Sequence, residues 1–139
     1  MNRRSLSLAL LSVALLGEVL ATAADPTEAA RVSVAAWLGR LDAADYSATW
    51  NTAAEAFKAA TTTQGWSRAA QAVRAPLGQL RTRTEKSATV TRTLPGAPDG
   101  LYVVFQFNTV FENKAQAVET VTVKQESAAT WKVAGYFIK

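Results

Sequence analysis

This chain lacks the side chains that most hydrolases use as nucleophiles and bases. Its 139 residues include no histidine and no cysteine. The composition therefore excludes thiol nucleophiles, Ser-His-Asp triads, and zinc sites built from histidine or cysteine. Most familiar hydrolase mechanisms are thus excluded, and we expect no metal and no cofactor.

Glu119 is the carboxylate best placed for acid–base chemistry. Alternation along its predicted strand puts it on the same face as Val121 and Val123. A carboxyl group buried beside apolar side chains can act as a general base, and Tyr46 is then a candidate general acid. The alternative is a structural role, in which Glu119 lies at the sheet margin and pairs with an arginine or caps a loop amide.

Basic residues gather between residues 68 and 92. Three of them are candidates for binding an anionic ligand through planar guanidinium groups: Arg74, Arg81 and Arg83. Arg81 and Arg83 would hold one anion together if they share a strand face. The alternative is a solvated surface whose charges serve only solubility. Aromatic residues do not alternate with these charges, so we expect no nucleic-acid partner.

The elements that must position these residues change in character near Gly78. Before it, apolar residues recur at helical spacing, and three helices are predicted. The first helix has Thr27 as its N-cap and ends at residues 43–45. The second helix begins at Asp45 or Tyr46. The apolar face of the first helix comprises Ala30, Val34, Trp37, Leu38 and Leu41, and that of the second comprises Trp50, Ala53, Ala54 and Phe57.

The third helix is predicted to follow a cap at Thr63 and to end at Pro76 and Gly78. After it, threonine, valine and aromatic residues alternate with a period of two. Short loops between consecutive strands indicate an antiparallel meander. The four predicted strands cover approximately residues 80–94, 101–111, 117–125 and 131–138.

Alternation along the strands predicts which side chains meet the helices. On the second strand these are the apolar residues at odd positions: Leu101, Val103, Phe105, Phe107 and Phe111. On the fourth strand they are Trp131, Val133 and Phe137, with a β-bulge expected at Gly135. The sequence thus predicts an α+β fold in which three N-terminal helices pack on one face of a curved four-stranded antiparallel meander.

The opposite face of the predicted sheet is less polar than a solvated face should be. Tyr102 and Val104 on the second strand and Tyr136 on the fourth are predicted to lie there. Exposed apolar surface of this kind often marks an interface with another protein. We therefore expect this outer face to bind a second copy of the chain or a protein of the cell envelope.

The beginning of the chain has the pattern of a secretory signal peptide. Arginines precede an apolar run over residues 6–20, and small residues precede a cleavage point after Ala23. The run is too short to span a bilayer, and no cysteine is present for lipid attachment. We expect a signal peptide over residues 1–23, one α+β domain over residues 24–139, and a periplasmic or secreted product with no stable membrane anchor.

Four segments, taken together and in order, resemble a known family. They are WLGRLDAADYSATW at 37–50, RAPLG at 74–78, LPGAPDGLY at 94–102 and WKVAGYFI at 131–138. In these segments the chain is similar to the bacterial family of domain of unknown function 4019. The resemblance implies an exported bacterial protein and carries no established activity. The order of elements also resembles the cystatin-like and nuclear-transport-factor-2-like cone folds.

Two functions follow from these patterns. The absence of histidine, cysteine and paired acids favours an exported, non-catalytic module that binds a ligand or a protein through the sheet face or the mouth of the helix–sheet cavity. The alternative is a cone-fold enzyme of isomerase or lyase type with Glu119 as general base and Tyr46 as acid. The second function requires an accessible apolar pocket that contains Glu119.

Overall fold

The structure is a computed structural model that describes residues 25–139, so the predicted signal peptide lies outside the described residues. No helix within residues 25–139 is both long and apolar enough to cross a membrane. The helices are α1 (Pro26–Asp42), α2 (Tyr46–Asn51), α3 (Glu55–Ala60), α4 (Thr63–Arg74) and the short 3₁₀ helix η1 (Ala75–Leu77). The strands are β1 (Leu80–Thr91), β2 (Tyr102–Phe111), β3 (Lys114–Ser127) and β4 (Thr130–Ile138).

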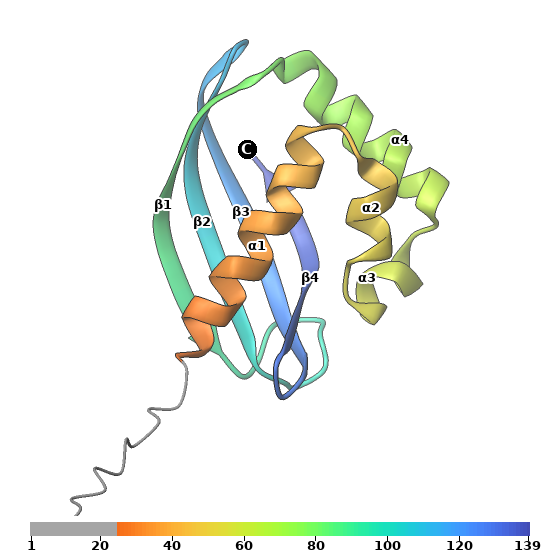
Figure 1. The fold of residues 1–139 in the computed structure, drawn as a ribbon, viewed down its shortest axis with the longest axis vertical. Helices are drawn as coiled ribbons and strands as arrows, with labels where there is room; N and C mark the ends of the chain where they lie inside the picture. The colour runs from red at the N-terminus through yellow and green to blue at the C-terminus, as the bar shows by residue number, and fades with distance from the viewer. Residues whose placement is uncertain (1–24) are drawn as a thin grey trace, which may run out of the picture.

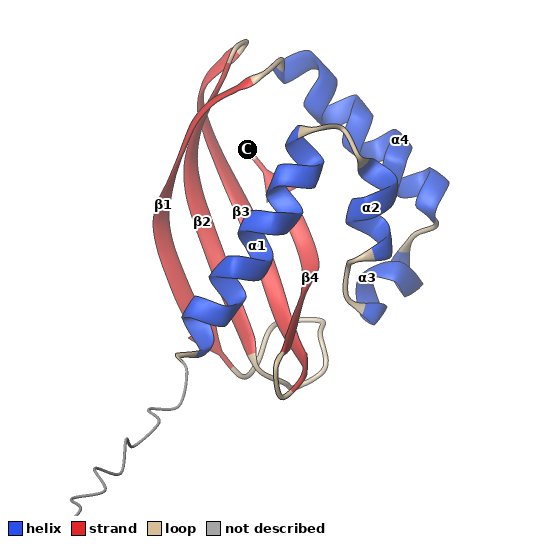
Figure 2. Ribbon diagram, in the orientation of Figure 1, coloured by secondary structure: helices blue, strands red, loops and turns tan. Residues whose placement is uncertain are grey.

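The helices come first and the sheet second, as predicted, which makes the fold α+β (Figure 1). The four strands form one antiparallel sheet in the order β1-β2-β3-β4. Helix α1 lies along one face of the curved sheet, and α2, α3 and α4 form a group beside α1 and β4 (Figure 2). The sheet edge at β4 therefore meets the helices, whereas the edge at β1 lies on the far side.

The apolar face of α1 is buried as its spacing predicts. Its five predicted core residues are at most 2 % exposed: Ala30, Val34, Trp37, Leu38 and Leu41. The helix begins two residues earlier than expected, because Asp25 is the N-cap and its side chain accepts a hydrogen bond from the Thr27 amide at 3.0 Å. Pro26 occupies the first helical turn, where its missing N–H costs nothing.

The second predicted helix is divided into α2 and α3. The chain becomes extended at Ala54, whose amide donates to the Val133 carbonyl of β4 at 2.8 Å. An amide inside a continuous helix has its hydrogen bond within that helix, so this contact with the sheet requires a break. The hydroxyl of Thr52 bonds the Ala48 carbonyl at 2.7 Å and closes α2 just before the break. The cap of α4 is Thr62 instead of the predicted Thr63.

The sheet buries the predicted face of β2 against α1. Val103, Phe105 and Phe111 are almost fully buried, and Phe105 and Phe107 stack with ring centroids 6.1 Å apart. Val121 and Val123 of β3 lie on the same side, opposite Phe105 and Val103 respectively. Except for Phe111, these residues form one continuous core with the apolar face of α1.

Register shifts between neighbouring strands change which side chains reach that core. The β3–β4 register passes from Val123 opposite Val133 to Thr122 opposite Gly135, so Ala134 is an extra residue beside the predicted bulge. Because the bulge reverses alternation, Tyr136 packs against the core and Phe137 is 55 % exposed. The predictions that Phe137 points inward and Tyr136 outward are therefore wrong. A similar register shift at Arg81 interrupts β1.

Candidate functional site

Glu119 lies on the helix-facing side of β3, where its alternation with Val121 predicted it, and its side chain has no exposed surface. Both of its oxygens accept hydrogen bonds. Arg83 donates to them from Nε at 2.7 Å and from Nη2 at 3.2 Å. The hydroxyl of Thr109 donates at 2.6 Å, and the hydroxyl of Tyr136 donates to the second oxygen. These four hydrogen bonds use about all the lone pairs that a carboxylate offers.

Asp42 connects Glu119 to a second arginine. It ends α1, and its carboxylate accepts from Arg83 at 2.8 and 2.9 Å and from Arg74 at 2.7 Å. An acidic residue is unfavourable at a helix C-terminus, because the helix dipole is negative there, and the two guanidinium groups offset this effect. We call this group of six residues the arginine–carboxylate cluster: Asp42, Arg74, Arg83, Thr109, Glu119 and Tyr136.

The electrostatics of the cluster favours the charged forms of Asp42 and Arg83 and the neutral form of Tyr136. Burial by itself raises the pKa of Asp42, but hydrogen bonds from Arg83 and Arg74 outweigh burial and hold that pKa below its ordinary value of 3.8. Burial lowers the pKa of Arg83, and the two carboxylates more than reverse that effect. Burial, together with the charge and hydrogen bond of Glu119, strongly raises the pKa of the Tyr136 hydroxyl. The Tyr136 hydroxyl therefore donates a hydrogen bond to Glu119 but keeps its proton, which makes it a poor general acid.

Arg74 is less completely satisfied than Arg83. It is 6 % exposed and lies over the Phe111 ring, with its guanidinium carbon 4.8 Å from the ring centroid. Its Nη2 atom donates to Asp42. Its Nε and Nη1 atoms are buried and have no hydrogen-bond partner among residues 25–139. Most buried polar atoms in folded proteins have a protein or water partner, so these two nitrogens require an explanation.

A pocket of about 320 Å³ opens between α4 and β4 and reaches Arg74. We call it the α4–β4 pocket. It is lined by Leu41, Trp66, Ala69, Ala70, Val73, Arg74, Tyr136, Phe137 and Ile138. Its floor is buried at Leu41, Ala70 and Arg74, whereas Val73 and Phe137 are 44 % and 55 % exposed and form its rim. Arg74 is the only charged residue of the lining, and the remaining walls are largely apolar.

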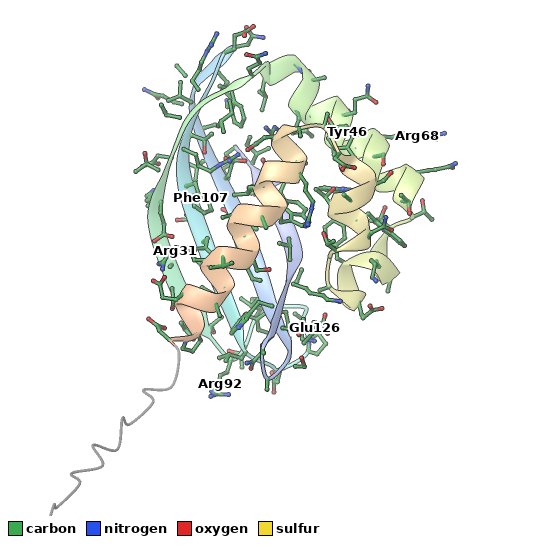
Figure 3. All side chains as sticks on the ribbon, in the orientation of Figure 1. Arg31, Tyr46, Arg68, Arg92, Phe107 and Glu126 are labelled. Carbon is green, nitrogen blue, oxygen red and sulfur yellow. The ribbon has the colours of Figure 1, made fainter. Side chains whose placement is uncertain are left out.

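The predicted catalytic pair is not brought together at an accessible site. Tyr46 lines a second pocket, of about 450 Å³, with Asp42 and Arg74 at the corner between α1 and α2. Figure 3 shows Tyr46 at this corner, near the start of α2. Glu119 has no exposed surface that a substrate in this pocket can reach.

The predicted anion-binding arginines separate into two environments. Arg74 and Arg83 share Asp42 inside the cluster. Arg81 lies at the bulge of β1, is 56 % exposed and pairs with Glu112 at 3.2 Å. The expectation that Arg81 and Arg83 hold one anion together is therefore wrong. The rest of the basic stretch is spread out as well, since Arg68 on α4 and Arg92 beyond β1 lie at opposite ends of the molecule (Figure 3).

The predicted outer-face residues also separate. Tyr102 is 2 % exposed, and its hydroxyl donates to the Pro98 carbonyl at 2.6 Å, so the chain's own loop covers it. Tyr136 belongs to the cluster on the inner side. Of the three, Val104 is the one that remains half-buried at the outer face, between Thr89 of β1 and Thr122 of β3. The expected apolar surface around Tyr102 and Tyr136 is therefore absent from the described outer face.

Two members of the cluster were missed by the reasoning from sequence. Asp42 follows the buried Leu38 by four residues, so both lie on the same side of α1. Thr109 holds an odd position between Phe107 and Phe111 on β2, which already places it inward. Each signal was present, but only the packed structure shows that Asp42, Thr109 and Glu119 converge on one arginine.

Among the described residues, no group of three or more acidic residues is placed to hold a metal ion. The family model described as "Protein of unknown function (DUF4019)" matches residues 33–136 of the chain. No curated protein and no solved structure matches it. The resemblance to the cystatin-like and nuclear-transport-factor-2-like cone folds thus stays a prediction.

Proposed function

This chain belongs to the DUF4019 family of proteins of unknown function. From its own geometry we propose an exported, non-catalytic domain that binds a small, largely apolar ligand in the α4–β4 pocket. The observation that carries this proposal is an open, largely apolar pocket beside a saturated carboxylate. Its volume lies at the lower end of the roughly 300–1,000 Å³ that is usual for small-molecule sites.

The state of Glu119 argues against the enzymatic alternative. A general base needs a lone pair within hydrogen-bond reach of the substrate proton. Glu119 is fully buried and its acceptor capacity is used by Arg83, Thr109 and Tyr136. We therefore assign it to the framework that fixes the floor of the pocket.

A protein partner is the second candidate function, and the rim of the same pocket favours it. Val73 and Phe137 are apolar and exposed on either side of the opening. A partner that inserts one apolar side chain would cover both residues. In the first candidate function a small ligand fills the pocket, whereas in this one a side chain of the partner protein fills it.

The export part of the proposal rests on the sequence of residues 1–23. Expression of the full chain in a bacterium is expected to yield a periplasmic or secreted product whose intact mass corresponds to cleavage near Ala23. Retention of the uncleaved chain in the cytoplasm would contradict export.

The binding part is tested on that purified product with the neutral fluorescent probe N-phenyl-1-naphthylamine. Saturable binding is expected, and it should be lost in Ala69→Trp, because Ala69 is an exposed residue of the pocket lining. The matched control is Ala72→Trp, the same substitution on the same helix at an exposed position outside the pocket. Equal binding by the two variants, or no saturable binding by the wild type, would refute a ligand site between α4 and β4.

A further inference from the structure

We propose that the ligand of the α4–β4 pocket is a small aliphatic carboxylate whose head group accepts hydrogen bonds from Arg74. This inference rests on the proposed function and specifies its ligand class. It depends on three properties of the pocket: the sign of its one charged residue, the state of that residue's donors, and the apolar character of the other walls.

The donors of Arg74 decide which polar group the ligand carries. A guanidinium group has five N–H donors and no acceptor, so its partner must be an acceptor. Arg74 uses Nη2 on Asp42, and its Nε and Nη1 atoms have no partner among residues 25–139. A buried donor without an acceptor is unfavourable, and a ligand oxygen would remove that cost.

The charges of the cluster favour an anionic acceptor. Arg83 contacts two carboxylates, those of Asp42 and Glu119. Arg74 contacts one, and it shares that one with Arg83. Arg74 is therefore the less compensated of the two cations. A carboxylate matches the planar guanidinium better than a neutral oxygen and makes the stronger hydrogen bonds.

The other lining residues of the pocket indicate that the body of the ligand is apolar. Apolar side chains from α1, α4 and β4 form them, and the opening lies between the exposed side chains of Val73 and Phe137. Because Arg74 is buried and the rim residues are exposed, the head group would lie at the floor and the apolar body toward the opening. A short aliphatic chain fits this arrangement, and the volume of about 320 Å³ limits its length.

The test compares octanoate with 1-octanol as competitors of N-phenyl-1-naphthylamine, using the full chain after export. Octanoate is expected to bind at least about tenfold more tightly, as hydrogen bonds to a charged group allow. Affinity should also rise about fourfold for each methylene added between hexanoate and octanoate, because each one enters apolar surroundings. Equal or tighter binding of 1-octanol would mean that water satisfies Arg74, and would overturn the carboxylate inference while leaving the apolar pocket intact. If the fluorescent probe itself fails to bind, the proposed function fails first.

Variants at Val73 test the sign of the site without disturbing the cluster. Val73 is an exposed rim residue, so polar substitutions there are compatible with folding. Val73→Lys is expected to bind octanoate several-fold more tightly than Val73→Glu, whereas the two variants should bind 1-octanol equally, because both lose the same apolar contact. Octanoate binding that is indifferent to this charge reversal would contradict the inference. Arg74→Gln should remove the preference for octanoate over 1-octanol, with circular dichroism as the check that the variant folds.

Discussion

Arg83 and Arg74 share the Asp42 carboxylate, and they differ in how completely the rest of the fold satisfies them. Arg83 donates from Nε, Nη1 and Nη2 to two carboxylates. Arg74 donates from Nη2 alone and lines an open pocket. Arg83 uses four of its five N–H groups and has no side-chain nitrogen without a partner, whereas Arg74 has two such nitrogens. The number of carboxylates that each arginine contacts thus distinguishes Arg83, a structural ion-pair residue, from Arg74, a candidate binding residue.

The largest effect is expected for Glu119→Gln, which leaves Arg83 buried with part of its counter-charge missing. Loss of one partner of a buried pair should lower the free energy of unfolding by about 3 kcal/mol or more. Urea denaturation at pH 7 measures it. A loss below about 1 kcal/mol would show that Arg83 does not depend on Glu119, and would break the distinction between the two arginines.

Asp42→Asn is expected to lower the free energy of unfolding by less, about 2 kcal/mol. Asp42 is partly exposed, so water can replace part of the hydrogen bonding that its carboxylate gives the two arginines. Its pKa is lowered in the folded state, so its contribution is complete above the unfolded value of 3.8 and is lost as the pH falls below it toward the folded value. Stability curves from pH 7 to pH 2 should therefore fall less steeply below about pH 4 in Asp42→Asn. The control is Asp99→Asn, in the exposed loop before β2, which should follow the wild type.

Tyr136→Phe removes one of the four hydrogen bonds to Glu119 and is expected to cost about 1 kcal/mol. The pKa of Tyr136 is raised on folding, so its stabilisation is complete below the unfolded value of 10.0 and is lost as the pH rises above it. The wild type should lose stability above pH 10 faster than Tyr136→Phe does. Tyr46→Phe is the matched control, and parallel curves for wild type and Tyr136→Phe would contradict the hydrogen bond that Tyr136 donates to Glu119.

Arg81→Gln should have the smallest effect, within about 0.5 kcal/mol, because its ion pair with Glu112 is exposed to solvent. Urea denaturation in low and high salt measures it, together with Glu112→Gln. If Arg81→Gln lowers the free energy of unfolding as much as Glu119→Gln does, solvent exposure does not distinguish the ion pair of Arg81 from that of Arg83. The argument from burial would then be wrong.

Local patterns predicted the parts of the fold that depend on neighbouring residues. The burial of Trp37, Leu38 and Leu41 follows from helical spacing, and that of Phe105 and Val121 follows from alternation along strands. The inward position of Glu119 is confirmed for the same reason. These periodicities are intrinsic to helices and strands and need no knowledge of the partner surface.

Predictions failed where the register of two strands decided the outcome. Extra residues in β1 and β4 reverse the alternation after them, which sends Tyr136 inward, leaves Phe137 exposed and separates Arg81 from Arg83. A bulge arises from how one strand fits its neighbour, so its effect on later residues cannot be assigned from one strand alone. Gly135 signalled the bulge but did not fix which side the following residues take.

The sequence by itself determined the order of helices and strands, the antiparallel meander, the apolar faces of α1 and β2, and the absence of histidine and cysteine chemistry. Tertiary structure decided which charges meet. Asp42, Arg83 and Glu119 come from α1, β1 and β3, and their hydrogen bonds require contacts between residues far apart in the chain. Whether a buried charge is saturated or has donors left for a ligand depends on these distant contacts, which no local pattern encodes.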